Sequence, residues 1–263
     1  MNNDIRAESW NHLQELIFAD SWNADLGRFR SKNVFRGLSD AAYQLETTLI
    51  RLGGDYCKME HHLLRNFVKY AHRDVVERNT VWHWLSVAQH HGLPTRLMDW
   101  TYSPFVAMHF ATANIEQYAL DGVIWIVDYV KAHGLLPTEL KKELEREGAF
   151  AFTVDMILNA AGSFNEFANL LPDEDFLLFF EPASIDDRFI NQYALFSISS
   201  NPRLVLNNWL ERYPALWSRI IIPSELKWEI RDKLDQSNIT ERVLFPGLDG
   251  LSDWLKRAYS PKR

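Results

Sequence analysis

The sequence predicts an α+β fold built as a single compact domain. Apolar stripes at helical spacing dominate the first half of the chain, and short β-prone apolar runs cluster in the second half. No Gly/Ser-rich linker, low-complexity tract or internal repeat interrupts the 263 residues. Hydrophobic residues form 47% of the chain, which is enough to build a core and excludes a disordered chain.

The first third of the chain predicts three helices and one short strand. Residues 8–18 place apolar side chains at helical spacing, with Ser9 as a cap, and predict an amphipathic helix. The β-prone run 33–37 is stopped by its glycine and predicts a strand that ends in a turn. An apolar stripe predicts a long helix over 55–76, and another helix follows over 81–90.

Polar residues gather between two helices in the next segment, 89–101. Gly92 and Pro94 end the helix before it, whereas Ser103 and Pro104 start a helix after it as cap and first helical residue. We therefore expect 89–101 to be a loop or a short strand.

The rest of the chain alternates β-prone apolar runs with segments that favour helix. The expected elements are strands over 122–128, 176–181, 193–198 and 217–222 and helices over 137–148, 223–235 and 251–259. Opposed charges three and four residues apart make 137–148 a solvated helix that ends at Gly148. Ser224 is the expected cap of the next helix, and a polar connector over 182–192 separates two strands that either pair with each other or lie in one sheet.

Charge and cysteine content restrict the classes of function. Lys and Arg number 28 and Asp and Glu number 35, so the net charge of −7 provides no global basic field for nucleic acid or anionic membrane. The single cysteine, Cys57, excludes an intramolecular disulfide and a cysteine-based zinc site. The N-terminus resembles no signal peptide, and no apolar run approaches the roughly 20 residues of a membrane span. We therefore expect a soluble, cytoplasmic protein.

Candidate functional side chains lie at the ends of the expected elements, where active groups are often placed. Arg36 ends the first strand, and its planar fork can hold a phosphate or carboxylate, although an internal salt bridge is equally compatible with its position. The segment 89–101 contributes His90, His91, Thr95, Arg96, Asp99 and Thr101. Adjacent histidines point apart on a helix, so we expect no metal site. Arg96 and Asp99 could bridge each other, and Thr101 could cap a turn.

Two later residues could act on a sugar. Glu181 ends the run FLLFFE and is a candidate general base, although a carboxylate in that position more often lies at the surface. Gln192 begins an apolar strand and can hydrogen-bond a sugar hydroxyl, but it cannot act as a base. The sequence has no P-loop, no GxGxxG after a strand, no GxSxG and no HExxH, so kinase, Rossmann oxidoreductase, serine hydrolase and zinc protease functions have no support.

Four stretches form a specific set when they are taken together. They are NVFRGLS over 33–39, AQHHGLPTRLMDWT with SPFVAMHFA over 88–111, RFINQYALFS over 188–197 and LFPGLDGL over 244–251. This set resembles the FRG-domain family of bacteria and phages, whose name corresponds here to Phe35-Arg36-Gly37. The resemblance implies an N-terminal helical segment over 1–32 and an FRG domain of ADP-ribosyltransferase type over 33–263.

The order of elements in this family resembles the ADP-ribosyltransferase superfamily, and it implies a split β-sheet core. That superfamily has a strand bearing Arg or His, a polar strand followed by a helix, and a later strand that begins with Glu. Arg36 matches the first position, and the stretch NQYALF over 191–196 is similar to the poly-ADP-ribose polymerase pattern Asn-Glu-Tyr followed by apolar residues. Gln192 replaces the glutamate that normally holds the ribose hydroxyl and steadies the charge developing as nicotinamide leaves. Either Gln192 supplies only hydrogen bonds, or Glu181 or Asp99 supplies the charge.

The resemblance implies an NAD-dependent ADP-ribosyltransferase with NAD as co-substrate and no metal. It assigns catalysis to Arg36, Gln192, Glu181 and Asp99. It assigns NAD binding to Arg36, Gly37, His91, Thr95, Trp100, Thr101 and Tyr193. Arg36 would bind the phosphates or the nicotinamide ribose, Thr101 the ribose or carboxamide, and Trp100 or Tyr193 would pack nicotinamide.

The family's genetic context implies a growth-arresting toxin of a toxin–antitoxin or antiphage defence system. The acceptor would be nucleic acid, with RNA favoured, or protein, and an antitoxin protein is a possible partner. Candidate RNA contacts are the basic residues Arg28, Arg30, Lys32, Arg51 and Arg73. Two alternatives remain open: a non-catalytic module that senses a nucleotide or phage component through Arg36 and His91, and a metal-independent RNase that uses His90 or His91 with Arg96.

Overall fold

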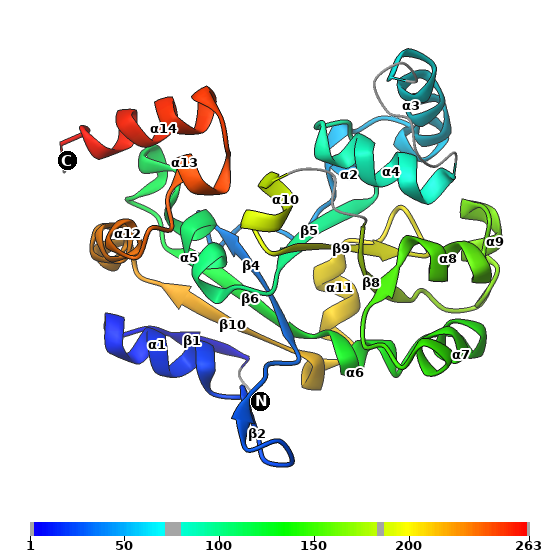
Figure 1. The fold of residues 1–263 in the computed structure, drawn as a ribbon, viewed down its shortest axis with the longest axis horizontal. Helices are drawn as coiled ribbons and strands as arrows, with labels where there is room; N and C mark the ends of the chain where they lie inside the picture. The colour runs from blue at the N-terminus through cyan, green and yellow to red at the C-terminus, as the bar shows by residue number, and fades with distance from the viewer. Residues whose placement is uncertain (1–2, 72–79, 183–186, 262–263) are drawn as a thin grey trace.

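The computed structural model describes residues 3–71, 80–182 and 187–261, in which helices pack around one mixed sheet (Figure 1). The sheet has eight strands in the order β1-β10-β6-β4-β5-β9-β8-β7. Their bounds are β1 Asp4–Arg6, β4 Asn33–Leu38, β5 Leu97–Thr101, β6 Gly122–Asp128, β7 Phe152–Thr153, β8 Leu177–Glu181, β9 Ala194–Ser199 and β10 Trp217–Ile222. The α+β class is confirmed, and the segment 89–101, expected to be a loop or a strand, ends in strand β5.

The N-terminal segment contains more than the expected helix. Besides α1 (Trp10–Phe18) it holds β1, which pairs in parallel with β10, and a separate hairpin of β2 (Trp22–Asn23) and β3 (Arg28–Phe29). These strands are two or three residues long and have no recognisable period of their own. The edge strand β1 forms only because β10 supplies its hydrogen-bonding partners from the other end of the chain.

Most long helices lie where the sequence predicts them. The remaining helices are α2 Thr48–Leu52, α3 Tyr56–Ala71, α4 Val81–His90, α5 Pro104–Thr112, α6 Tyr129–His133, α7 Thr138–Glu147, α8 Val154–Ala160, α9 Phe164–Ala168, α10 Asp187–Asn191, α11 Leu206–Glu211, α12 Lys227–Gln236, α13 Glu241–Leu244 and α14 Leu248–Ala258. Ser9 and Ser103 accept the expected capping bonds, and Gly148 ends α7 with a left-handed φ of 60°. Residues 72–76 of the helix expected over 55–76 lie outside the described residues.

Several boundaries and short helices differ from the expectation. Ser224 starts a 3-10 turn, η3 (Ser224–Leu226), instead of capping α12, and α14 begins at Leu248 rather than at 251. Helix α10 lies inside the connector expected over 182–192. The central strands β4 and β5 belong to the first half of the chain, so strands are not confined to the second half. None of the described helices is long and apolar enough to cross a membrane.

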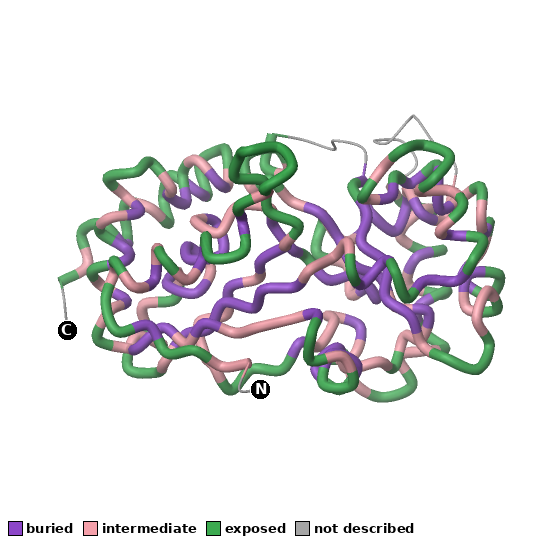
Figure 2. The backbone as a smooth tube through the Cα atoms, turned by 90° about the horizontal axis from the view of Figure 1, so that it is seen from below, coloured by how far each residue is buried: buried purple, intermediate pink, exposed green. Residues whose placement is uncertain are grey.

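The sheet is buried between three apolar clusters, and its strands form the buried centre of the molecule in Figure 2. One cluster, which includes Trp100, Trp125 and Trp209, covers one face of both halves of the sheet. The opposite face is divided into a cluster around Phe35 with α5 and α12 and another around Phe196 with α4, α8 and α9. The division falls between β4 and β5, which are adjacent but share the single residue pair Phe35–Thr101.

Gly37 allows the strand β4 and the helix α5 to pack closely. The strand continues through Gly37 to Leu38, so the turn expected at this glycine is wrong. A Cβ atom built on Gly37 would lie 1.8 Å from the backbone oxygen of Ala107 in α5. The glycine is therefore required by helix–strand packing rather than by a turn.

Candidate functional site

Arg36 projects from β4 at the point where β4 and β5 diverge. Its Nη1 donates to the backbone oxygen of Asp99 at 2.5 Å and lies 4.0 Å from the Asp99 carboxylate. The side chain is 18% exposed, and Nε is buried with no hydrogen-bond partner among the described residues. Burial lowers the pKa of Arg36, Asp99 opposes that shift, and nearby Arg51 adds to it. Since an arginine remains charged in proteins, Arg36 is a cation with an unused donor beside a second cation.

Asp99 is the exposed end of a hydrogen-bonded chain that begins in the interior. Gln89 donates from Nε2 to Asp99 Oδ2 at 2.9 Å and accepts from Thr95 Oγ1 at 2.5 Å. Thr95 is fully buried, and its Oγ1 also accepts from the backbone of Leu97 at 3.1 Å. These bonds fix the direction of the Asp99 carboxylate, which is 57% exposed and free to meet a ligand. Thr95 therefore positions Asp99 through Gln89, and it has no exposed surface that could contact NAD.

Thr101 and Gln192 meet where β5 ends and β9 begins. Thr101 Oγ1 donates to the backbone oxygen of Gln192 at 2.7 Å and accepts from the backbone of Ser103 at 2.9 Å, so the expected turn cap is present. The carboxamide of Gln192 instead donates to the backbone oxygen of Leu244 in α13 at 2.9 Å. Arg36 and Thr101 therefore lie on the neighbouring strands β4 and β5, and Gln192 lies in the turn just before β9, but each of the three side chains also has an internal partner.

A carboxylate and three tyrosines lie beyond Thr101. Tyr102 donates to Glu181 Oε1 at 2.8 Å, and its ring centroid is 5.1 Å from that of Tyr193 and 5.8 Å from that of Tyr129. Burial and the bond to Glu181 raise the pKa of Tyr102 well above its ordinary value, so its hydroxyl stays protonated and donates. Tyr193 has a left-handed φ of 47° and is 62% exposed, which presents its ring to solvent.

The residues Arg36, Asp99, Glu181 and Tyr193 form what we call the Arg36 surface. Other predicted site residues lie away from this surface or inside the core. Trp100 is 2% exposed and donates to Ser197 Oγ at 2.9 Å, so its ring has no free face on which nicotinamide could stack. Gly37 faces α5. His91 is exposed after the end of α4, and its ring lies 6.3 Å from Phe67 of α3.

Arg96 does not bridge Asp99 and cannot assist a histidine at the surface. It is 5% exposed and makes a two-bond contact with the buried carboxylate of Glu60, with Nε donating to Oε1 at 2.7 Å. Its guanidinium also lies 4.5 Å from the ring centroid of Phe164. This buried pair stabilises the packing of α3 against the segment before β5, and the RNase alternative loses its proposed cation.

A cavity of about 1000 Å³, which no sequence pattern predicted, lies between α5, α12, α13 and α14. Its lining does not include Arg36, Thr101 or Gln192. His109 and Phe245 line it, and both lie in the stretches 88–111 and 244–251 that carry the family resemblance. The presence of both residues in those stretches was the one sequence feature that could have pointed to this cavity. Among the described residues, no group of three His, Cys, Asp or Glu side chains could hold a metal ion.

Residues 31–119 match the family model of the FRG domain. The chain contains an FRG domain. This domain spans β4, β5 and α5, and it therefore includes Arg36, Asp99 and Thr101. Glu181, Gln192 and Tyr193 lie outside the matched residues. No curated protein and no solved structure matches the chain.

Proposed function

We propose that this protein is an NAD-dependent ADP-ribosyltransferase whose NAD site is centred on Arg36. One observation carries the proposal: the Arg-bearing strand β4, the strand β5 with its following helix α5, and the strand β9 that follows Gln192 are neighbours in the sheet. These are the three elements that the superfamily resemblance requires. The single Phe35–Thr101 pair between β4 and β5 leaves a divergence beside Arg36, which supports a split core.

The charges near Arg36 suit the pyrophosphate of NAD. The buried, unpartnered Nε of Arg36 and the exposed cation of Arg51 provide donors and positive charge for phosphate oxygens. Tyr193 offers the exposed ring that Trp100 does not, so it is the residue assigned to pack nicotinamide.

The reaction breaks the bond between the anomeric carbon of the ribose and the nicotinamide nitrogen, and nicotinamide leaves with the bonding electron pair. The resulting oxocarbenium-like state is stabilised by a carboxylate, for which Asp99 and Glu181 are the exposed candidates. An acceptor nucleophile then bonds to the anomeric carbon and loses its proton to a carboxylate. The acceptor is a macromolecule, with RNA favoured over protein, and the modification arrests growth unless an antitoxin protein opposes it.

The bond from Gln192 to Leu244 favours a second candidate, a module that binds a nucleotide without reacting. A carboxamide held by a backbone oxygen cannot replace the charge of a catalytic glutamate. In that case the Arg36 surface would bind NAD or a related nucleotide and release no nicotinamide.

The experiment is to incubate the purified protein with labelled NAD and cell extract and to measure nicotinamide release and label transfer. We expect Arg36→Ala and Arg36→Lys to lower the rate about 100-fold, since one lost transition-state contact is worth roughly 3 kcal/mol. Asp99→Asn and Glu181→Gln identify the carboxylate. Arg146→Ala on α7 is the matched control and should leave the rate unchanged.

The outcomes separate the candidates. Nicotinamide release that Arg36→Ala preserves would reject the assignment of Arg36. Saturable NAD binding to a folded wild-type protein, with no nicotinamide release on any acceptor, would favour the sensing module. Shortening of RNA without NAD would favour a nuclease.

A further inference from the structure

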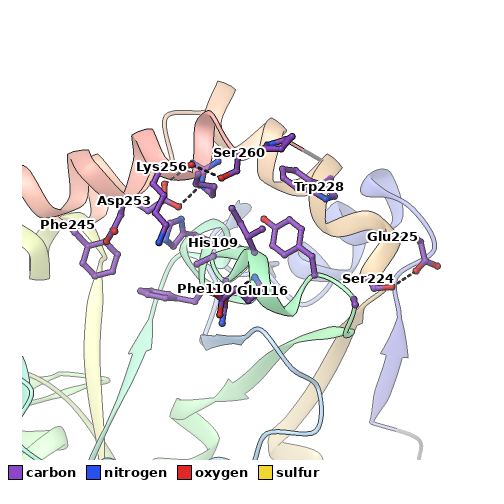
Figure 3. A pocket seen from close by; sticks show the side chains of 18 residues that line it. His109, Phe110, Glu116, Ser224, Glu225, Trp228, Phe245, Asp253, Lys256 and Ser260 are labelled. Atoms are coloured by element: carbon purple, nitrogen blue, oxygen red, sulfur yellow. Dashed lines mark hydrogen bonds and ion pairs between the residues drawn. The ribbon is translucent and has the colours of Figure 1, made fainter. Parts of the chain in front are cut away.

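The cavity between α5, η1 (Ile115–Gln117), α12, α13 and α14 is built from aromatic walls around a buried polar floor (Figure 3). Its volume of about 1000 Å³ is enough for a drug-sized molecule. His109, Glu241 and Arg257 form the buried polar part, at 1%, 7% and 5% exposure. The cavity is separate from the Arg36 surface, so what it binds does not depend on the proposed transferase activity.

His109 presents a fixed hydrogen-bond donor at the wall of this cavity. Arg231 donates from Nη1 to His109 Nδ1 at 2.7 Å, and a guanidinium cannot accept, so Nδ1 is the acceptor. The neutral ring therefore carries its proton on Nε2. Burial, together with the charge of Arg231, lowers the pKa of His109 to about 3, which keeps this tautomer neutral. An oxygen atom of a ligand in the cavity can accept a hydrogen bond from Nε2–H of His109.

Two aromatic pairs form the apolar walls. Phe110 and Phe245 meet edge to face with ring centroids 6.2 Å apart, and Tyr118 and Trp228 do so at 4.9 Å. The rings of Phe110 and Tyr118 come from one part of the chain, and those of Trp228 and Phe245 come from a part more than 100 residues later. Flat aromatic surfaces of this kind pack a ring and also attract a cation.

The exposed charged side chains in the cavity lining are mostly carboxylates. Arg257 is neutralised internally, because it makes paired bonds of 2.6–2.8 Å to Glu241 and to Asp235. The remaining charged groups in the lining are three carboxylates, Glu116, Glu225 and Asp253, against the single ammonium group of Lys256. Among the described residues, Glu116, Asp253 and Lys256 form no salt bridge. This excess of negative charge repels phosphates and favours a positively charged ligand.

We propose that the cavity binds a small aromatic amine whose ring carries a hydroxyl or carbonyl oxygen. The ring packs between the two aromatic pairs, the oxygen accepts from His109 Nε2–H, and the ammonium group lies among the exposed carboxylates. We do not expect NAD or other phosphorylated nucleotides to bind this cavity, because the exposed carboxylates in its lining repel phosphate groups.

A charge series with one common ring tests the proposal. Tyramine, 4-hydroxyphenylethanol and 3-(4-hydroxyphenyl)propionate differ in the charge of the chain end and share the phenol. We measure their dissociation constants for the full chain by calorimetry and by saturation-transfer NMR. We expect tyramine to bind at least about tenfold more tightly than the propionate, with the alcohol between them.

Variants at the rim assign the binding to this cavity. Asp253→Asn and Glu116→Gln should each weaken tyramine binding about threefold, as expected for an exposed charge pair. Trp228→Leu should weaken it about tenfold through loss of the aromatic face. Asp249→Asn, one turn earlier on α14 and outside the cavity lining, is the matched control and should have no effect.

Three results overturn the proposal. They are failure of tyramine to bind the folded protein, propionate binding as tight as tyramine binding, and tyramine binding that Trp228→Leu and Asp253→Asn leave unchanged. Circular dichroism of each variant verifies the fold, and the charge series on the wild-type protein remains decisive if a variant fails to fold.

Discussion

Acidification should destabilise this protein well above the pH at which carboxyl groups titrate, because two histidines are buried in the neutral form. His133 is 3% exposed, accepts from the backbone N–H of Phe179 at 2.9 Å, and donates from Nδ1 to the backbone oxygen of Phe150 at 2.9 Å. Burial lowers the pKa of His133 to about 4, and burial with Arg231 lowers that of His109 to about 3. Both pKa values lie below the ordinary value of about 6.5, so the unfolded chain binds more protons.

The sign and the size follow from proton linkage. Folding stability is complete above the unfolded pKa and falls as the pH drops from there toward the folded values. Between about pH 7.5 and about pH 5, each histidine costs about 2 kcal/mol, or about 4 kcal/mol for the pair. This is a large part of the roughly 5–15 kcal/mol that stabilises a typical domain. Carboxyl groups titrate mainly below about pH 5, so the chosen range isolates the histidines.

Urea denaturation at several pH values, followed by tryptophan fluorescence and circular dichroism, measures this loss. In His133→Gln, the carboxamide can still donate to Phe150 and accept from Phe179, but it does not titrate. We therefore expect the variant to lose about 2 kcal/mol less than the wild type over the same range. Equal losses in variant and wild type, or a gain of stability on acidification, would refute the reasoning.

Two further predictions concern packing. Gly37→Ala should cost about 3 kcal/mol of unfolding free energy or prevent folding, because the added Cβ meets the backbone of α5. The control is Gly162→Ala, whose added Cβ meets only the Glu166 carboxylate at 3.4 Å and should cost far less. Thermal denaturation compares the stabilities of the two variants. Glu60→Gln should cost about 3–5 kcal/mol by leaving the buried charge of Arg96 without its carboxylate, and a loss under about 1 kcal/mol in chemical denaturation would show that the pair is not a stabilising contact.

Most helices and strands with a clear period were predicted correctly, whereas helices of five residues and strands of two or three residues were not. The caps at Ser9 and Ser103 and the left-handed end of α7 at Gly148 depend on neighbouring residues alone, so they could be inferred locally. Helices such as α2 and α9, with five residues each, are too short to show a helical period and are stabilised by tertiary packing.

The candidate site was predicted as a set of residues but not as a set of contacts. The location of Arg36 at a strand and of Thr101 at a turn followed from sequence. The partner of Arg96 did not, because Glu60 is 36 residues earlier, on the helix α3. Trp100 is a residue of the type that often stacks on a flat ligand. Only its burial on the face of strand β5 shows that it belongs to the core.

By itself the sequence determined that this chain has an apolar core of helices and strands and resembles the FRG family, because composition, periodicity and motifs are properties of neighbouring residues. The tertiary structure decided which side chains share a surface: the divergence of β4 and β5 beside Arg36, the neutral tautomer of His109 and the aromatic walls around it. These features arise from strand register and helix packing between residues far apart along the chain, and pairings at that distance leave no pattern in a single sequence.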